Sequence, residues 1–210
     1  MLTLYDRERS GNCYRVRLLL ALLRLPFKRI PITRSGSGNN DLPSGFFDLN
    51  PRLQIPVLLT GDRVIWDSHA ILVYLAREYG DEKWLPLSSN VMSQIMQWIA
   101  LNLNEGTYGL ARARSIRGQR REGNLEDTQI ISKLALETLN IRLRENEWLA
   151  TSDAPTIADI ACYPYVAMAP EAGISLRPYE GVNHWIRRIQ KLPGYIELPS
   201  YDGKGGPIAE

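Results

Sequence analysis

The chain of 210 residues has little cysteine and little histidine, with two of each. Cys13 and Cys162 lie far apart in the sequence and make no disulfide framework. His69 and His184 are also isolated, and no spacing of histidine and cysteine resembles a zinc site. We therefore expect no metal ion in this protein.

Long apolar runs and an excess of one charge are also missing. No run reaches the roughly 18 apolar residues of a membrane span, and no small-residue cleavage site follows the first leucines. The 25 basic and 23 acidic residues give a net charge of +2, which favours neither nucleic acid nor anionic lipid as a partner. The one dense basic run, 112–121, is short and is expected to be a solvated joint. We expect a cytoplasmic protein without a nucleic-acid or membrane partner.

The composition that remains is that of a globular protein, because 44% of the residues are hydrophobic and 23% are charged. The length allows one large domain or two small ones.

Residues 1–79 alternate between strand and helix patterns. We expect strands at 2–5, 27–32, 57–60 and 63–66, helices at 12–24 and 68–79, a loop at 33–44 and a helical turn at 45–49. A helix between the first two strands implies that they pair in parallel, and the short connection at 61–62 implies an antiparallel hairpin. Pro31 places the second strand at a sheet edge.

Residues 80–90 contain glycine, proline and two serines, which are typical of a domain boundary. After it we expect only helices, at 91–111, 125–148, 156–168 and 179–192, with a polar joint at 116–123 and a loosely held end at 200–210. The predicted organisation is a first domain at 1–79, a linker at 80–90 and an all-helical domain at 91–210.

The first motif that could carry chemistry is SGNCYRVR, where the first strand turns into the first helix. A helix N-terminus offers unpaired N–H groups and partial positive charge, which stabilise a thiolate. The hydroxyl of Ser10 could donate a hydrogen bond to such a thiolate. The alternative is that Ser10 only caps the helix, since serine is a preferred N-cap residue.

The second motif is LQIPV, directly before the hairpin. A cis bond between Ile55 and Pro56 would leave the backbone of Ile55 open to an extended peptide, which could pair with it as an added strand. The alternative is a trans proline that opens an edge strand.

The third motif is WDSHAIL, where a strand ends and a helix starts. Ser68 offers a hydroxyl and a helix-terminal N–H to a carboxylate, and Asp67 offers an anion to an ammonium group. Together they could hold the head of an amino acid. The alternative is an ordinary Asp–Ser helix cap.

The fourth motif, APTIADIA, is interpreted as structural. Thr156 and Asp159 have the spacing of a capping box at the start of an apolar helix.

Taken together, the pieces SGNCYRVR, NPRLQIPVL, WDSHAILVYL and APTIADIACYP resemble the cytosolic glutathione transferase family along nearly the whole chain. The resemblance is to its serine-type, bacterial-like members. It implies an α/β, thioredoxin-like N-terminal domain of βαβ–ββα order that binds glutathione, followed by an all-α domain that builds the pocket for the second substrate.

The resemblance also implies roles for single residues. Ser10 resembles the hydroxyl that activates the thiolate, and Asn12 could replace or assist it. Gln54 and Ile55 match the segment that pairs with the cysteinyl backbone of glutathione, and Asp67 with Ser68 matches the pair that holds its γ-glutamyl head. For the glycine carboxylate the sequence leaves three candidates open: Arg34, Arg52 and Gln54. The second-substrate pocket would involve Trp98, Asn102, Tyr108 and Arg112, although Trp98 has an alternative as a core residue.

The implied activity is that of a glutathione S-transferase in detoxification. Glutathione would be the co-substrate, its thiolate would attack a small and apolar electrophile, and the protein would be a homodimer. Two alternatives remain. Ser10-x-x-Cys13 looks like a redox motif with its first cysteine replaced, so Cys13 could serve a glutathione-dependent thiol–disulfide oxidoreductase or peroxidase. The fold could also serve as a non-catalytic glutathione-binding module.

Overall fold

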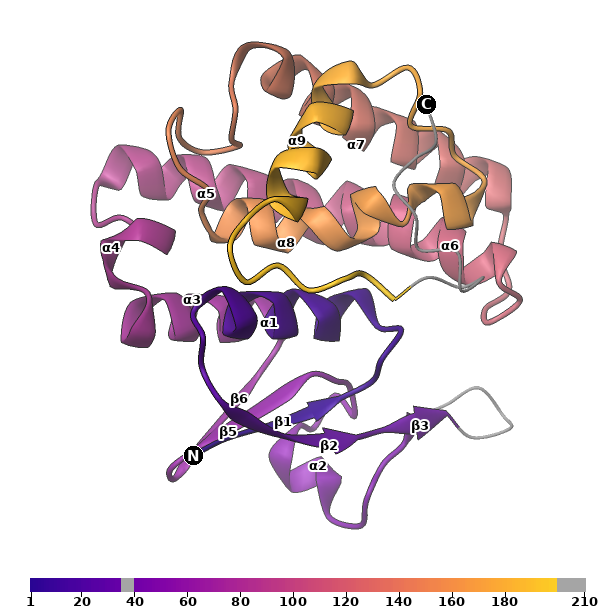
Figure 1. Ribbon diagram of the computed structural model, residues 1–210. Coiled ribbons are helices and arrows are strands. Elements are labelled where there is room, and N and C mark those ends of the chain that lie inside the picture. Colours follow the sequence, from indigo (N-terminus) through magenta and orange to yellow (C-terminus); the bar gives the residue numbers. More distant parts are fainter. Residues whose placement is uncertain (35–39, 200–210) are drawn as a thin grey trace.

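The structure, a computed structural model, describes residues 1–34 and 40–199 (Figure 1). Residues 35–39, within the predicted loop, and 200–210, predicted to be loosely held, lie outside the described residues.

A four-stranded mixed sheet forms the first half of the chain. Its strands are β1 (Leu2–Asp6), β2 (Phe27–Pro31), β5 (Val57–Thr60) and β6 (Arg63–Trp66), in the order β2-β1-β5-β6. β1 pairs in parallel with β2 and antiparallel with β5, and β5 and β6 form the hairpin. The predicted parallel pair and hairpin are confirmed. Pro31 lies in an edge strand, as its missing N–H requires.

Two helices cover one face of this sheet, and a short one lies on the other (Figure 1). α1 (Gly11–Leu22) and α3 (Ser68–Tyr79) lie between the sheet and the helical half, while α2 (Phe46–Leu49) packs beyond the sheet, where the Phe46 ring meets the edge of Tyr5 at 5.3 Å between centroids. The predicted loop holds one feature the sequence did not suggest, a two-residue ribbon of β3 (Thr33–Arg34) and β4 (Asn40–Asp41).

The second half is helical, as predicted, and is reached through a short helix that was not predicted, α4 (Asp81–Trp84), inside the expected linker. Its elements are α5 (Ser89–Leu101), η1 (Asn102–Ala111), α6 (Arg112–Arg117), α7 (Leu125–Glu145), α8 (Ile157–Ala167), η2 (Ala169–Ala172) and α9 (Glu180–Gln190). This half and the first share one apolar core, because α8 packs against both α1 and α3. No helix in the described part of the chain is long and apolar enough to cross a membrane.

Two of the predicted helices differ from the observed ones. The predicted helix at 91–111 changes at Asn102 into a ten-residue π-helix, η1, in which the Thr107 hydroxyl donates to the Asn102 carbonyl five residues back at 3.0 Å. The predicted helix at 125–148 ends at Glu145, because Asn146 turns extended, and Trp148 packs into the core from the following loop.

The capping box at the start of α8 is confirmed. The Thr156 hydroxyl accepts from the Ala158 N–H at 3.3 Å, and the Asp159 carboxylate accepts from the Thr156 N–H at 2.8 Å.

Candidate functional site

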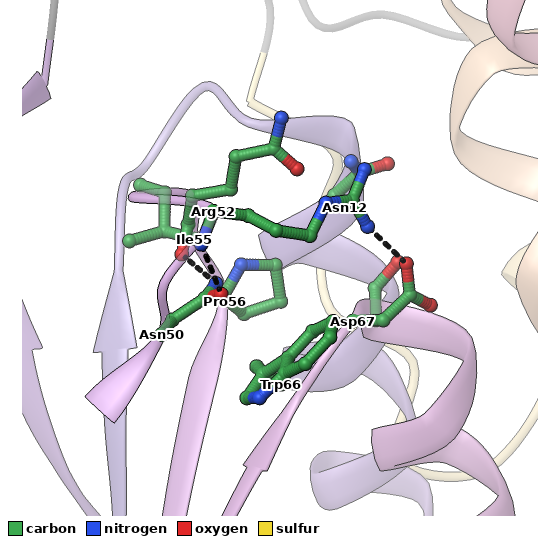
Figure 2. Close-up of a pocket in the computed structure, with 9 residues that line it drawn as sticks. Asn12, Asn50, Arg52, Ile55, Pro56, Trp66 and Asp67 are labelled. Carbon is green, nitrogen blue, oxygen red and sulfur yellow. Dashed lines mark hydrogen bonds and ion pairs between the residues drawn. The ribbon is translucent and has the colours of Figure 1, made fainter. Parts of the chain in front are cut away.

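A small cavity lies where the N-terminus of α1, the loop before β5 and the start of α3 meet (Figure 2). Its volume is about 20 Å³, which is room for a water molecule. It is lined by Asn12, Asn50, Arg52, Gln54, Ile55, Pro56, Trp66, Asp67 and Ser68. The structure therefore brings residues of three predicted motifs to one place.

At the N-terminus of α1, Asn12 lines this cavity and Ser10 does not. Ser10 is the N-cap residue, its hydroxyl oxygen accepts from the Cys13 N–H at 3.3 Å, and only 8% of it is exposed. The Ser10 hydroxyl also hydrogen-bonds the Cys13 thiol, which lowers the pKa of that thiol and partly offsets the effect of its burial. Ser10 thus has the predicted cap geometry, while Asn12 is the residue of this motif that lines the cavity.

Cys13 is fully buried, in a small apolar cluster with Phe46 and Val57. Burial raises the pKa of its thiol to about 12, and the Asp6 carboxylate adds to this rise. A thiol of this kind is neither accessible nor ionised near neutral pH, which disfavours the disulfide chemistry considered as an alternative.

The loop before β5 is held by its own side chains. Asn50, which is almost fully buried, donates from Nδ2 to the Gln54 carbonyl at 2.8 Å and accepts from the Arg52 N–H at 3.0 Å. The Ile55–Pro56 peptide bond is cis, as the interpretation of this motif required. Asn50 was not predicted as a site residue, although an asparagine directly before a proline is typical of a turn in which the asparagine side chain hydrogen-bonds the backbone two residues on.

Asp67 joins β6 to α3 in a backbone conformation that is uncommon for a side chain, with φ at 71°. A strained residue of this kind costs of order 1–3 kcal/mol and is often found at functional sites. Its Oδ1 accepts from the His69 N–H at 2.8 Å and contacts the His69 ring nitrogen Nδ1 at 3.2 Å. These hydrogen bonds from His69 hold the pKa of the Asp67 carboxyl well below its usual range, so the group is an anion.

The other oxygen of Asp67, Oδ2, is directed differently. Arg52 reaches across the cavity toward it, with Nη1 at 3.8 Å (Figure 2). About half of the Arg52 side chain is exposed, so solvent screens this ion pair and a competing cation can replace it.

Ser68 lies in front of a buried cation. Arg15, of which 1% is exposed, donates from Nη1 to the Ser68 hydroxyl oxygen at 3.2 Å and to the His69 ring nitrogen Nε2 at 2.7 Å. Nε and Nη2 of Arg15 have no hydrogen-bond partner among residues 1–34 and 40–199. Because Arg15 donates to the Ser68 oxygen, the Ser68 hydroxyl hydrogen remains available to an acceptor in the cavity. Neither Arg15 nor His69 was predicted as a site residue, since their contacts come from other elements of the fold.

The four residues predicted for the second-substrate pocket do not line this cavity. Asn102 is buried and donates from Nδ2 to the His69 ring at 2.8 Å. Tyr108 is 64% exposed, and Arg112 donates to the Glu122 carbonyl at 2.8 Å. Trp98 is half-buried against the core, in line with its structural alternative. Of the candidates for the glycine carboxylate, Arg52 and Gln54 line the cavity, and the side chain of Arg34 lies outside the described part.

Potential metal ligands do not gather in the described residues: they contain no group of three or more His, Cys, Asp or Glu side chains that could hold an ion. The chemistry available at the cavity is therefore that of an anion at Asp67, a cation at Arg52, a hydroxyl at Ser68 and an amide at Asn12.

Comparison with known proteins gives this arrangement a family. Residues 9–78 match the sequence profile described as the glutathione S-transferase N-terminal domain. The chain is 26% identical over 200 residues to the glutathione S-transferase GstB of Escherichia coli strain K12, covering 92% of this chain and 95% of that protein. It is 32% identical over 155 residues to glutathione S-transferase 2 of Anopheles gambiae, covering 71% of this chain and 72% of that protein.

Solved structures agree over almost the full length. A possible glutathione S-transferase from Rhodopseudomonas palustris superposes with a TM-score of 0.84 at 31% identity, over 94% of this chain and 97% of that one. A glutathione S-transferase from Pseudomonas fluorescens gives 0.84 at 30% identity, over 95% and 99%. With a thioredoxin-like first half, a helical second half and these relatives, the chain belongs to the glutathione S-transferase family of enzymes.

Proposed function

We propose that this protein binds glutathione on the surface around the cavity between α1, the Pro56 loop and α3, and activates its thiol for attack on a small, apolar electrophile. The observation that carries the proposal is the convergence on one cavity of Asn12, the Gln54–Ile55–Pro56 segment and the Asp67–Ser68 corner. These segments are far apart in the sequence, and each supplies a different group that a tripeptide needs.

The γ-glutamyl head fits the Asp67–Ser68 corner. Oδ2 of Asp67 faces the cavity as an anion and would take the ammonium group. The free hydroxyl hydrogen of Ser68, with the buried guanidinium of Arg15 behind it, would take the α-carboxylate. The ammonium would displace Arg52 from Asp67, and the released guanidinium would then be free to turn toward the glycine carboxylate, beside Gln54.

The sulfur would lie at the N-terminus of α1. There the helix dipole and a hydrogen bond from a side chain both favour the thiolate over the thiol and lower its pKa. The candidate donors are Ser10, whose hydroxyl would turn from the Cys13 thiol to the sulfur of glutathione, and Asn12, through its amide. Bound next to the thiolate, the electrophile reacts by proximity. For its pocket, Trp98, Tyr108 and Arg112 remain sequence-based candidates, with Tyr108 the most open of them to solvent, whereas the fourth candidate, Asn102, is buried against His69.

The test compares Ser10→Ala with Asn12→Ala. The thiol pKa of bound glutathione is followed by thiolate absorbance, and kcat is measured with an activated chloronitrobenzene. We expect Ser10→Ala to raise the bound thiol pKa and to lower kcat. If only Asn12→Ala does so, the role of donor passes to Asn12. Absence of thiolate formation and of turnover by the unaltered protein, with glutathione bound, would instead favour a non-catalytic binding module.

We also propose that the protein acts as a homodimer, in the cytoplasm, in the detoxification of electrophiles. Large apolar side chains are exposed on both halves, such as Phe47 on α2 and Met96 on α5, with 61% and 50% exposed. A dimer that joins the first half of one copy to the helices of the other would cover such residues. Sedimentation or light scattering of the protein, with Phe47→Ser as the variant expected to weaken the dimer, checks the assembly.

A further inference from the structure

Behind the Asp67–Ser68 corner, a chain of buried polar side chains connects the two halves of the molecule. Asn102, the first residue of the π-helix η1, donates from Nδ2 to Nε2 of His69 at 2.8 Å. Arg15 of α1 donates to the same nitrogen at 2.7 Å. On its other side the His69 ring reaches Oδ1 of Asp67 at 3.2 Å. Asn102, Arg15 and His69 are all buried, and we refer to these three residues as the buried triad.

The contacts of the buried triad fix the protonation of His69. An arginine nitrogen can only donate, so Nε2 of His69 accepts and carries no proton. The proton of the neutral ring is then on Nδ1, from which it is donated to Oδ1 of Asp67. Burial and the charge of Arg15 also lower the pKa of His69, which agrees with this assignment.

One oxygen of Asp67 is thereby held by His69, and the other faces the cavity. Oδ1 accepts from both the backbone N–H and the ring of His69. Oδ2 takes part in neither bond and faces Arg52 across the cavity. The backbone N–H and the ring of His69 together hold the orientation of the Asp67 carboxylate, so that its second oxygen is directed to the cavity.

Asn102 can reach His69 only because Gly106 leaves room for it. A Cβ atom on Gly106 would lie 2.7 Å from Oδ1 of Asn102, which is closer than real contacts allow. The obstructing atom is the end of a side chain, so a Gly106→Ala variant would relieve the clash by turning the Asn102 amide. The turned amide would no longer donate to His69 in its present direction.

We propose that Asn102 of the helical half acts through His69 as a positioning residue for the glutathione site. Together with Arg15, Asn102 would hold the ring of His69 in place, and His69 would hold the Asp67 carboxylate in the orientation that receives the γ-glutamyl ammonium. This inference rests on the proposed function and adds to it a dependence of glutathione binding on a residue that does not touch glutathione.

The first experiment compares steady-state kinetics of Asn102→Ala and Gly106→Ala with those of Asn104→Ala. Asn104 is an exposed asparagine of the same helix whose side chain donates to the Ala100 carbonyl, so its removal is the matched control. We expect KM for glutathione to rise about three- to tenfold in the first two variants, the worth of one hydrogen bond. KM for the electrophile and kcat at saturating glutathione should stay close to those of the Asn104→Ala control.

The second experiment reads the tautomer directly. The chain has only two histidines, so long-range proton–nitrogen NMR of ¹⁵N-histidine protein gives two ring patterns, and exposed His184 is the internal reference. We expect His69 to show a protonated Nδ1 and a bare Nε2 at neutral pH. In Asn102→Ala the Nε2 signal should shift, because one of its two donors is gone.

The results separate this inference from the proposed function. A wild-type protein that does not bind glutathione overturns the proposed function and the role in binding together. Wild-type binding with an unchanged KM in both variants overturns only the positioning role. A rise in KM for both substrates alike, or a protonated Nε2 in His69, also overturns it. The NMR measurement needs no glutathione and remains informative if Gly106→Ala folds poorly.

Discussion

Two aspartates at helix starts, Asp67 before α3 and Asp159 in the first turn of α8, have opposite surroundings. Oδ1 of Asp159 accepts from the Leu149 N–H and the Trp185 indole, and its Oδ2 accepts from Thr156. Every acceptor is used, and the residue is fully buried. Asp67 accepts from the start of its helix through Oδ1, and its Oδ2 faces Arg52 across a cavity. On the proposed function, a carboxylate oxygen that faces a cavity, rather than the helix start itself, distinguishes a binding group from a folding group.

The backbone reinforces this difference. Asp159 lies inside regular helix, whereas Asp67 has a φ of 71° and a side chain that is 35% exposed. The strain at Asp67 is not needed to start a helix, because Thr156 starts α8 from an ordinary extended conformation. It does direct the Asp67 carboxylate toward the cavity, which is consistent with a function there.

Among the variants that test this comparison, Asp159→Ala is expected to have the largest effect, which is on stability. The variant leaves several buried N–H groups without acceptors, each costing about 1–3 kcal/mol, so we expect a loss of about 4 kcal/mol in the free energy of unfolding. Urea denaturation measures it. The matched control is Asp127→Ala, at the same position in the first turn of α7 but exposed, with an expected change within about 0.5 kcal/mol. Equal losses in the two variants would show that Asp159 is no more than a surface cap.

The next effect concerns binding and not stability. Asp67→Asn keeps an oxygen for the His69 N–H but removes the charge, so we expect the Kd for glutathione to rise about 30-fold, or about 2 kcal/mol for a charged hydrogen bond. The free energy of unfolding should change by less than about 1 kcal/mol. Calorimetric titration checks the Kd, with Asp62→Asn in the exposed hairpin turn as the control. An unchanged Kd would remove Asp67 from the site.

Local sequence signals were enough to predict most of the fold and one side of the site. The hairpin at 57–66 and the helix at 68–79 occur where strand and cap signals placed them, because these signals involve neighbours in the chain. The capping box of α8 was predicted for the same reason. The role of Asp67 as a cap and its place at the cavity also follow from residues 66–69 alone.

The contacts that residues of η1 make behind the site could not be predicted, because they depend on how far the helix turns at each residue. A pattern with 3.6 residues per turn assigns faces to 91–111 as one α-helix, whereas ten of these residues are π-helical and turn less at each residue. In this helix Tyr108 is 64% exposed, and Asn102 contacts His69. Arg15 and His69 were missed because Arg15 on α1 meets His69 on α3 only through packing within the first half, and Asn102 on η1 meets His69 only through packing of the two halves.

A smaller effect on stability is expected at Thr156, the cap of α8. Thr156→Ala removes the side-chain cap of α8 and should lower the free energy of unfolding by about 1 kcal/mol. The Kd for glutathione should not change, because the cap does not line the cavity. Thermal or urea unfolding together with calorimetry checks both statements. Thr138→Ala, an exposed threonine within α7, is the control and should change stability by less than about 0.5 kcal/mol.

The smallest effect is a dependence of stability on pH that originates at His69. Burial, with the charge of Arg15, lowers the pKa of His69 in the folded protein, although Asp67 opposes the shift. His69 therefore binds a proton more readily in the unfolded chain than in the folded protein. Above the unfolded pKa of about 6.5 both states are neutral and stability is highest, and the free energy of unfolding decreases as pH falls below that value. At pH 6 a single such group lowers the free energy of unfolding by at most about 0.8 kcal/mol.

The measurement is the slope of the free energy of unfolding between pH 7.5 and about 5.5, above the range in which Asp67 would take up a proton. His69→Gln should flatten this slope, whatever its effect on stability at pH 7.5, because its amide does not titrate. His184→Gln, which removes the exposed histidine, is the control and should leave the slope nearly as in the unaltered protein. If the slope survived in His69→Gln, the ring would not be held neutral by Arg15 and Asn102. The orientation of the Asp67 carboxylate toward the cavity would then need another explanation.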